Sequence, residues 1–321
     1  KPFERFYALY LNQNGNHKIF INQLETVPED LGVEKVRFTD SDSYMDLVIK
    51  TTDHTEPLGI DKKMPARFLL PLIDQKAASG FVNASLALDQ ARAVKDIQEQ
   101  ELMRKASHLN DMAMAEITHF FKEGVTETDL AEQLKKIYRD LGADGLSFEP
   151  LFAFGSNAAS GHHWPDDTRL KPGDCILVDI GCTWEGYCSD MTRTFFYKNV
   201  TQHQQEVYHT VLKANEEAEK AVTPGIPLSS LDQIARGIIT DKGYGSAFTH
   251  RLGHFIGLED HEFGDVSSAS ADRAVPGNIF SIEPGVYLEN DMGVRVEDLV
   301  LVTDHGHEIL NHFSKELTVI D

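Results

Sequence analysis

Histidines and acidic residues are concentrated in one short stretch, HRLGHFIGLEDHE, which runs from His250 to Glu262. Three histidines, one arginine and three acids stand there beside four large apolar residues. The stretch is too apolar for a solvated charged loop and too polar for an ordinary core strand. This composition indicates a site that needs His254 and His261 seven residues apart, with Arg251 close by.

Four carboxylates occur where the neighbouring residues predict buried strands. Asp179 follows CILV, and Asp190 precedes MTRTFF. Glu283 follows IFSI, and Glu297 lies within VRVEDLVLV. An ionised carboxylate is costly to bury unless it is paired or binds a cation, and too few basic residues lie nearby in the sequence to pair all four. One such acid is ordinarily a salt-bridged or edge residue, but four of them predict a metal site.

The chemistry of these side chains narrows the choice of metal. Four carboxylates and one imidazole suit Mn²⁺, Co²⁺ or Fe²⁺ better than a structural zinc, which prefers cysteine and histidine. The charge of four carboxylates is too large for one ion, so the set predicts two ions about 3.5–4 Å apart. Such a pair makes a nucleophile from water near neutral pH and polarises a carbonyl, as an amide hydrolase requires.

Several motifs resemble one known family. DIGCTWEGYCSDMTRT, HRLGHFIGLEDHE, SIEPGVY and GVRVED are similar to signatures of the pita-bread metallopeptidases, which include methionine aminopeptidase, aminopeptidase P, prolidase and the metal-free creatinase. The resemblance runs from about residue 90 to the end, with the motifs in family order. It implies that Asp179 binds one ion, His254 and Glu283 bind the other, and Asp190 and Glu297 bridge both. Because all five ligands are present, a creatinase-like enzyme without metal is not expected.

The resemblance also implies catalytic side chains beyond the ligands. Glu283 matches the family glutamate that shuttles the proton of the attacking water, and His261 matches the histidine that stabilises the tetrahedral intermediate. GSNAASGHHWPDD is similar to the family pattern Asn…Pro-His-x-x-Pro-x-Asp, whose spacing assigns the role to His162 rather than His163. Gly161 stands where the family has proline, so a more mobile loop is expected. The alternative is a surface loop with two solvated histidines.

Two positions indicate different subfamilies. Phe255, directly after the ligand histidine, is similar to aminopeptidase P, and we expect any narrowing of substrate choice there. Arg251 and Glu262 are instead similar to prolidases. A dipeptidase must recognise a free carboxylate, for which Arg251 with His250 offers charge-assisted hydrogen bonds. The alternative for Arg251 is a salt bridge with one of the abundant acids.

Arg295 lies two residues from Glu297 and therefore on the same face of the strand. It is a further candidate to border the substrate, although orienting the metal-binding acids suits it better.

The resemblance as a whole implies hydrolysis of the Xaa-Pro bond in dipeptides that end in proline, by a hydroxide that bridges two metal ions. Mn²⁺ is the preferred ion, Co²⁺ and Fe²⁺ are alternatives, and Zn²⁺ is less favoured. The enzymatic alternative is an aminopeptidase P acting on longer peptides. A non-catalytic binding protein would be expected to lack some ligand acids, and none is lacking.

The rest of the sequence predicts an α+β catalytic domain over 89–321. Apolar stripes predict a helix from Asp96 to Gly124 and another from Thr126, its N-cap, to Gly142. Strand-like runs follow, and then the same order recurs. This pattern indicates two similar halves, related by a pseudo-twofold, around a common sheet. The later elements are helices over 207–221 and 231–243 and strands over 175–180, 192–197, 279–283, 285–289 and 293–302.

Residues 1–88 predict a smaller α/β domain that resembles the N-terminal domain of creatinase and prolidase, incomplete at its start. Two apolar runs flank Asn14-Gly15 and predict a hairpin. Pro71 within ARFLLPLI predicts an edge strand, a strand end or a loop. The chain opens on Lys1 rather than Met, so the lack of a visible targeting segment carries little weight.

The overall charge and the cysteines restrict the partners. Asp and Glu number 51 against 30 Lys and Arg, a formal charge of −21, which disfavours nucleic-acid binding. Apolar runs are far too short for a membrane span. The three cysteines lack a CxxC spacing and predict free thiols in a reducing compartment, so a cytoplasmic location is expected. The family resemblance suggests a homodimer.

Overall fold

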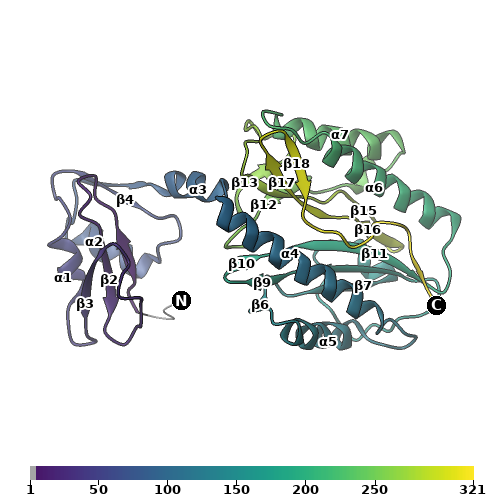
Figure 1. Ribbon diagram of the computed structural model, residues 1–321, viewed down its shortest axis with the longest axis horizontal. Coiled ribbons are helices and arrows are strands. Elements are labelled where there is room, and N and C mark those ends of the chain that lie inside the picture. The colour runs from purple at the N-terminus through teal and green to yellow at the C-terminus, as the bar shows by residue number, and fades with distance from the viewer. Residues whose placement is uncertain (1–4) are drawn as a thin grey trace. The chain divides into compact units, whose positions relative to one another are not determined.

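The computed structural model describes residues 5–321, so residues 1–4 of the expected N-terminal domain lie outside the described part. The chain divides into two compact units, Lys1–Leu88 and Asp89–Asp321, and each is described by itself (Figure 1). Helix α3, Ser85–Ala93, contains the boundary.

The first unit combines two small sheets with two helices. Strands β1 and β2 pair in antiparallel fashion, and Gly15 between them has a φ of +79°, so the predicted hairpin is confirmed. Strand β3 pairs with β2 in parallel, as β5 does with β4. The elements are β1 Ala8–Tyr10, β2 Lys18–Asn22, β3 Glu34–Phe38, α1 Tyr44–Ile49, β4 Pro57–Ile60, α2 Ala66–Asp74 and β5 Gly80–Asn83.

The segment around Pro71 is helical, and the prediction of a strand or loop there is wrong. Pro71 lies inside helix α2. Phe68 and Leu72, four residues apart, are buried in the core of this unit, and a helix places such a pair on one face. Burial of this apolar face outweighs the hydrogen bond that the nitrogen of Pro71 cannot donate.

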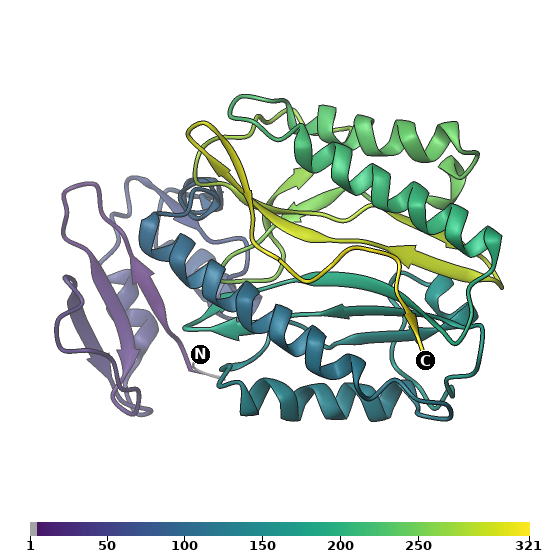
Figure 2. The same cartoon turned by 45° about the vertical axis from the view of Figure 1, so that its right-hand side comes forward.

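The second unit repeats two helices followed by strands, so the predicted fold class is confirmed (Figure 2). The first half contains α4 and α5; Thr126 caps α5 and forms the predicted capping box with Asp129. The second half contains α6 and α7. The helices are α4 Ile97–Thr118, α5 Glu127–Asp140, α6 Gln202–Lys220 and α7 Leu228–Asp241. The strands of the first half are β6 Gly145–Leu146, β7 Leu151–Phe154, β8 Cys175–Ile180, β9 Cys182–Trp184, β10 Tyr187–Cys188 and β11 Met191–Tyr197.

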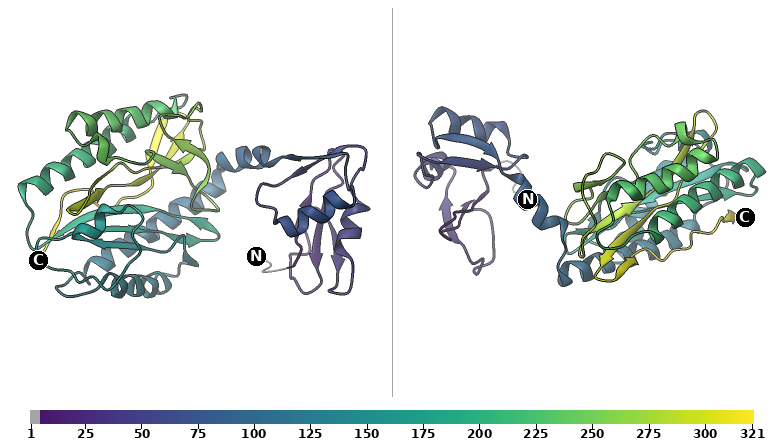
Figure 3. Two further views of the ribbon diagram at one scale, coloured as in Figure 1. Left: turned by 180° about the vertical axis from the view of Figure 1, so that it is seen from behind. Right: turned by 90° about the horizontal axis from the view of Figure 1, so that it is seen from above.

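The second half has its own strands. In the view from behind, the strands of both halves lie in front of α4 (Figure 3, left). The run 293–302 is divided into two strands, with Glu297 at the break. The strands are β12 Gly253–Phe255, β13 Glu262–Val266, β14 Ile279–Ile282, β15 Gly285–Leu288, β16 Met292–Arg295, β17 Asp298–Thr303 and β18 Gly306–Ile309, and β19 Val319–Ile320 closes the chain. Two short 3₁₀ helices are η1 Gly155–Ala159 and η2 Gly245–Ala247.

The two halves do not share one continuous sheet, which corrects the expectation of a common one. The first half pairs its strands in the order β19-β11-β8-β7, and the second in the order β13-β12-β14-β17-β18. At the seam, Glu297 N donates to Thr192 O at 3.1 Å, and Thr194 Oγ1 donates to Arg295 O at 3.0 Å. A side chain thus takes the place of a backbone partner there, so the ladder is interrupted. Two hydrophobic clusters fill this unit: one is formed mainly by the first half, and the other joins the second half to first-half residues such as Leu151, Cys175 and Phe196.

The three cysteines, Cys175, Cys182 and Cys188, are buried free thiols, as predicted. Burial raises the pKa of Cys175 to about 12, which makes its thiol a poor nucleophile. Among residues 5–321, no helix has both the length and the apolar character that crossing a membrane requires.

Candidate active site

A cavity of about 720 Å³ lies in the second unit. The cavity is lined by all ten residues that the sequence proposed as metal ligands, catalytic side chains or substrate-binding side chains. They are His162, Asp179, Asp190, His250, Arg251, His254, His261, Glu283, Arg295 and Glu297. The cavity also includes side chains that sequence reasoning did not select, among them Asp260, Tyr287 and Trp164.

Strand pairing brings the four predicted acids together at corresponding places in the two halves. In the first half, Thr192 of β11 pairs with Asp179 of β8, which places Asp190 beside Asp179. In the second half, Ile282 of β14 pairs with Asp298 of β17, so Glu283 and Glu297 lie just beyond the same paired position. Each antiparallel strand pair therefore contributes two carboxylates.

His254 completes this group from strand β12. Its Nε2 lies 3.4 Å from Asp190 Oδ2 and 3.6 Å from Glu283 Oε1. The backbone N–H of His254 donates to Ser281 Oγ, and that hydroxyl in turn donates to Glu283. Gly253 permits the close approach, because a Cβ there would lie 1.8 Å from the carbonyl oxygen of Ser281.

The acids leave buried oxygen atoms without partners. Within the described residues, Asp179 Oδ1, Asp190 Oδ1 and Glu297 Oε1 are buried and receive no hydrogen bond. Asp190, His254 and Glu297 also offer ligand atoms within 4.8 Å of one another. Buried carboxylate oxygens are costly when unpaired, and oxygen with one imidazole is a suitable donor set for divalent Mn, Fe or Co. These residues therefore fit a divalent-metal centre.

Burial and mutual repulsion shift the protonation of the group. Burial first, and then the neighbouring carboxylates, raise the pKa of Asp190 and of Glu297 well above the usual range. Burial likewise raises the pKa of Glu283 to about 7 and lowers the pKa of His254 to about 4. His254 is thus neutral at pH 7 and cannot compensate the acids. A bound cation would remove this repulsion.

Arg295 is held against the acids. Its Nη2 donates to Asp179 Oδ2 at 2.6 Å, its Nε to Thr192 Oγ1 at 2.9 Å and its Nη1 to Tyr287 OH at 2.8 Å. Thr192 Oγ1 donates to Glu297 Oε2 at 2.6 Å. These contacts favour orientation of the acids over direct contact with a substrate. Sequence reasoning missed Thr192 and Tyr287; the signal was the position of Thr192 two residues after Asp190, on the same strand face.

His250 and Arg251 line the cavity but have partners within the chain. His250 Nε2 lies 3.0 Å from Tyr287 OH, and burial lowers the pKa of His250 to about 4. Arg251 forms an ion pair with Asp265, the alternative that the sequence left open. Its side chain is 37% exposed, so the guanidinium remains within reach of the cavity.

His261 stacks on His254, with ring centroids 3.9 Å apart. Its Nδ1 lies 2.8 Å from Asp260 Oδ2, and this hydrogen bond raises the pKa of His261. Asp260 was missed by sequence reasoning, although it directly precedes His261. Its Oδ1 is buried and receives no hydrogen bond from the described residues.

The two neighbouring histidines on the 155–168 loop have different surroundings. His162 is exposed and lines the cavity. His163 Nε2 lies 2.7 Å from Glu127 Oε2, a buried carboxylate. The histidine chosen by motif spacing is therefore the one that remains open to a ligand.

Phe255 packs away from the cavity, against the expectation drawn from its place beside the ligand. It is buried in the core, its ring centroid is 5.5 Å from that of Phe280, and it is not among the residues that line the cavity. The strand register shifts between His254 and Phe255, and this irregularity directs the aromatic ring into the core. Any effect of Phe255 on a substrate must therefore act through β12.

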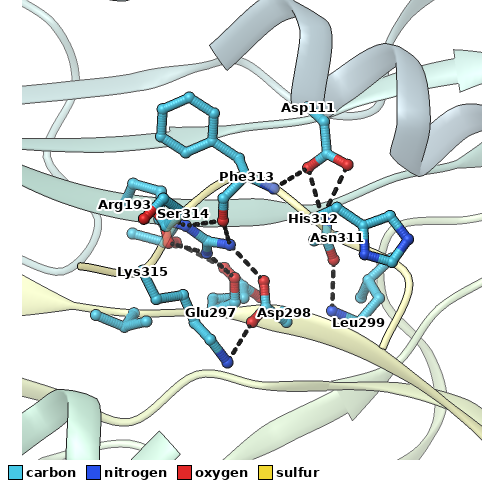
Figure 4. A network of polar contacts seen from close by, with 12 residues as sticks. Asp111, Arg193, Glu297, Asp298, Leu299, Asn311, His312, Phe313, Ser314 and Lys315 are labelled. Atoms are coloured by element: carbon cyan, nitrogen blue, oxygen red, sulfur yellow. Dashed lines mark hydrogen bonds and ion pairs between the residues drawn. The ribbon is translucent and has the colours of Figure 1, made fainter. Parts of the chain in front are cut away.

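Next to Glu297 lies a second group of charged side chains, which we call the ion-pair network and which comprises Arg193, Glu219, Asp298 and Lys315. Figure 4 shows Arg193, Asp298 and Lys315 of this network. Arg193 Nη2 donates to Asp298 Oδ1 at 2.6 Å, and Lys315 Nζ lies 2.8 Å from Asp298 Oδ2 and 2.6 Å from Glu219 Oε2. Arg193 Nη1 also donates to the carbonyl oxygen of Glu297 at 2.6 Å. The network thus fixes the backbone that carries one of the candidate ligands.

The repeated helix-helix-strand unit, with acids from both halves at one candidate metal centre, is compatible with a metallopeptidase. The model of metallopeptidase family M24 matches residues 101–304, and the chain belongs to this family. The chain is 36% identical to an uncharacterised peptidase of Staphylococcus aureus, over 98% of this chain and 90% of the relative.

Solved structures are similar along nearly the whole chain. A prolidase from Thermococcus sibiricus has a TM-score of 0.94 and 32% identity, over 99% of this chain and 89% of that one. An X-Pro aminopeptidase from Thermotoga maritima has a TM-score of 0.88 and 29% identity, over 98% of this chain and 90% of that one. Prolidases and Xaa-Pro dipeptidases are thus structural neighbours, and the resemblance inferred from the motifs is confirmed.

Proposed function

We propose that this metallopeptidase hydrolyses the Xaa-Pro bond of dipeptides that end in proline, with two divalent ions bound, preferably Mn²⁺. The observation that supports it most directly is the set of unpartnered, buried carboxylate oxygens beside a neutral His254 in one cavity. The similarity to prolidases supports the substrate class.

We assign the ions to five residues. Asp179 would hold one ion, His254 and Glu283 the other, and Asp190 and Glu297 would bridge them. Bound divalent ions would supply a nucleophile from water near neutral pH and polarise the scissile carbonyl. Arg295 and Thr192 would keep Asp179 and Glu297 in orientation through their hydrogen bonds.

The chain's own residues would move the proton and stabilise charge. Glu283 would accept the proton of the attacking water and return it to the proline nitrogen, which has no N–H and must be protonated to leave as a secondary amine. His261 and His162 would donate hydrogen bonds to the carbonyl oxygen as it gains charge and to the departing nitrogen. The exposure of both histidines to the cavity is compatible with these roles.

Recognition of the free carboxylate is proposed for Arg251 with His250 on the cavity wall. A specific observation favours the alternative, an aminopeptidase P acting on longer peptides. Arg251 already forms an ion pair with Asp265, and an X-Pro aminopeptidase is among the structural neighbours. The two readings differ in whether the cavity selects a carboxylate directly after proline.

The deciding experiment compares Xaa-Pro dipeptides with Xaa-Pro-Xaa tripeptides of the same first residue, using enzyme loaded with Mn²⁺. A higher kcat/KM for the dipeptide is expected, and preference for the tripeptide would establish the aminopeptidase alternative. The metal requirement is tested separately by chelation and reloading with Mn²⁺, Co²⁺, Fe²⁺ or Zn²⁺. Full activity after chelation would refute the metal mechanism.

The assembly and location also remain proposals. We propose a homodimer in the cytoplasm, on the resemblance to the family and on the three free thiols. Light scattering after size exclusion measures the assembly, and a monomeric mass would contradict it.

A further inference from the structure

One buried carboxylate, that of Glu127, receives four contacts from the segment that precedes β8. Phe154 N and Asn157 Nδ2 donate to Oε1 at 2.8 and 3.0 Å. Asp166 N donates to Oε2 at 3.1 Å, and His163 Nε2 lies 2.7 Å from the same oxygen. The side chain of Glu127 is fully buried and stands at the first position of α5, where a helix favours negative charge.

This arrangement is a tether rather than a metal site. Glu127, His163 and Asp166 have potential ligand atoms close enough to surround an ion. Each carboxylate oxygen of Glu127 already has two partners, however, from the end of β7 and the 155–168 loop, and the Nε2 of His163 lies 2.7 Å from Oε2. An ion would have to displace these hydrogen bonds, whereas the acids of the cavity have unpartnered oxygens.

The tethered loop carries two side chains that line the cavity. His162 and Trp164 flank the anchored His163, and both are exposed; Trp164 is 71% exposed. Gly161 O, on the same loop, accepts a hydrogen bond from Arg295. The anchor on His163 therefore determines where its two neighbours lie relative to the acids.

We propose that Glu127 is a positioning residue: its carboxylate anchors the 155–168 loop through His163 and so holds His162 and Trp164 at the cavity. The kinetic part of the proposal rests on the proposed function, because it treats His162 as a donor to the reacting peptide. The structural part, the order of the loop, does not depend on any activity.

The kinetic test uses Mn²⁺-loaded enzyme and an Xaa-Pro dipeptide. Glu127→Gln is expected to lower kcat/KM about tenfold to a hundredfold, since a charge-assisted hydrogen bond at a buried site is lost. The matched control is Glu132→Gln, a change of an exposed acid on the same helix, which is expected to match the parent. Because Glu127 would act through His162, combining Glu127→Gln with His162→Asn should cost little beyond His162→Asn alone. Fully additive losses would overturn the positioning role.

The structural test needs no substrate. The sequence has two tryptophans, so in a Trp184→Phe background the fluorescence anisotropy decay of Trp164 reports the motion of the loop. Glu127→Gln is expected to enlarge the fast component of that decay, and Glu132→Gln is not. His163→Gln, which changes the same contact from the loop side, should have the same effect and serves if Glu127→Gln does not fold. An unchanged decay in a folded variant would overturn the proposal. A changed decay in a chain without Xaa-Pro activity would refute only the proposed function.

Discussion

Two groups of charged side chains meet at the adjacent residues Glu297 and Asp298 and differ in their partners. In the acidic cluster, four carboxylates, those of Asp179, Asp190, Glu283 and Glu297, have one arginine, Arg295, and a neutral His254 beside them. In the ion-pair network, Asp298 and Glu219 contact Arg193 and Lys315. The acidic cluster therefore has fewer cations per carboxylate than the ion-pair network, although Glu219 Oε1 in the network also receives no hydrogen bond from the described residues.

The difference shows why burial alone does not identify a site. Glu297 and Asp298 are adjacent and both fully buried, but Asp298 has two cationic partners, whereas Glu297 Oε1 has no partner among the described residues. Removing one partner of a buried ion pair lowers the stability of the fold, because it leaves the other charge without a partner. Unpaired neighbouring acids repel one another until a cation binds. Replacing a carboxylate by an amide should therefore affect the free energy of unfolding differently in the two groups.

The largest effect is expected from loss of a carboxylate of the acidic cluster. Glu283→Gln should lower kcat by about 10³-fold, because it removes both a metal ligand and the proposed proton carrier. Steady-state kinetics on an Xaa-Pro dipeptide measure it, together with the metal content per chain. Activity within tenfold of the parent would remove Glu283 from both roles.

Loss of one carboxylate should change the free energy of unfolding differently in the two groups. Asp298→Asn is expected to lower the free energy of unfolding by about 3–5 kcal/mol, since it leaves Arg193 buried without its counter-charge. Asp190→Asn in metal-free protein should leave stability unchanged or raise it, because it relieves repulsion among the acids. Urea unfolding at pH 8 in the presence of chelator measures both. Equal destabilisation by the two variants would contradict the distinction.

The pH dependence of stability should change when metal binds. Burial raises the folded-state pKa of Glu283 to about 7, above its usual 4.5, so this group stabilises the metal-free fold at low pH and loses that contribution as the pH rises through about 7. Burial also raises the pKa of Glu219, in the ion-pair network, to about 8, with the same sign. Mn²⁺ should cancel the first dependence and leave the second. Tm measured from pH 5 to 9 with chelator and with Mn²⁺ tests this, and parallel curves would contradict it.

The smallest effect is expected at the exposed pair of Arg251 and Asp265. Arg251→Ala should raise KM for dipeptides about fivefold with little change in kcat, as loss of an exposed charged contact made equally before and during reaction would do. Its effect on unfolding should stay within about 0.5 kcal/mol. Initial rates over a range of dipeptide concentrations measure KM. An unchanged KM would exclude Arg251 from binding the substrate.

Much of the fold and the candidate centre could be predicted, because the signals are local. Apolar spacing and the Thr126 cap located the first helices, and acids within apolar runs located residues such as Asp179 and Glu297. These features follow from periodicity and from the cost of burying charge, which need no knowledge of contacts.

What could not be predicted depends on contacts between distant segments. Pro71 by itself predicts a strand end or a loop, but the segment is helical because a helix buries Phe68 and Leu72 on one face. The place of Phe255 in the motif predicts an influence on substrate choice, but the strand register shifts next to it and its ring lies in the core. Glu127 had no motif of its own, since its partners lie 27 to 39 residues further along the chain.

The adjacency of Glu297 and Asp298 has a consequence for how the chain finds its fold. Neighbouring residues of a strand project to opposite faces, so a slip of one residue exchanges their environments. If β17 slipped against β14, Leu299 or Glu297 would occupy the position that Asp298 takes opposite Ile282, where Arg193 finds its carboxylate. A leucine there would leave a buried guanidinium without a counter-charge, at a cost of several kcal/mol. The ion pair of Arg193 with Asp298 thus disfavours a slip that brings Leu299 to this position, and so helps to fix the register that places the candidate ligand Glu297.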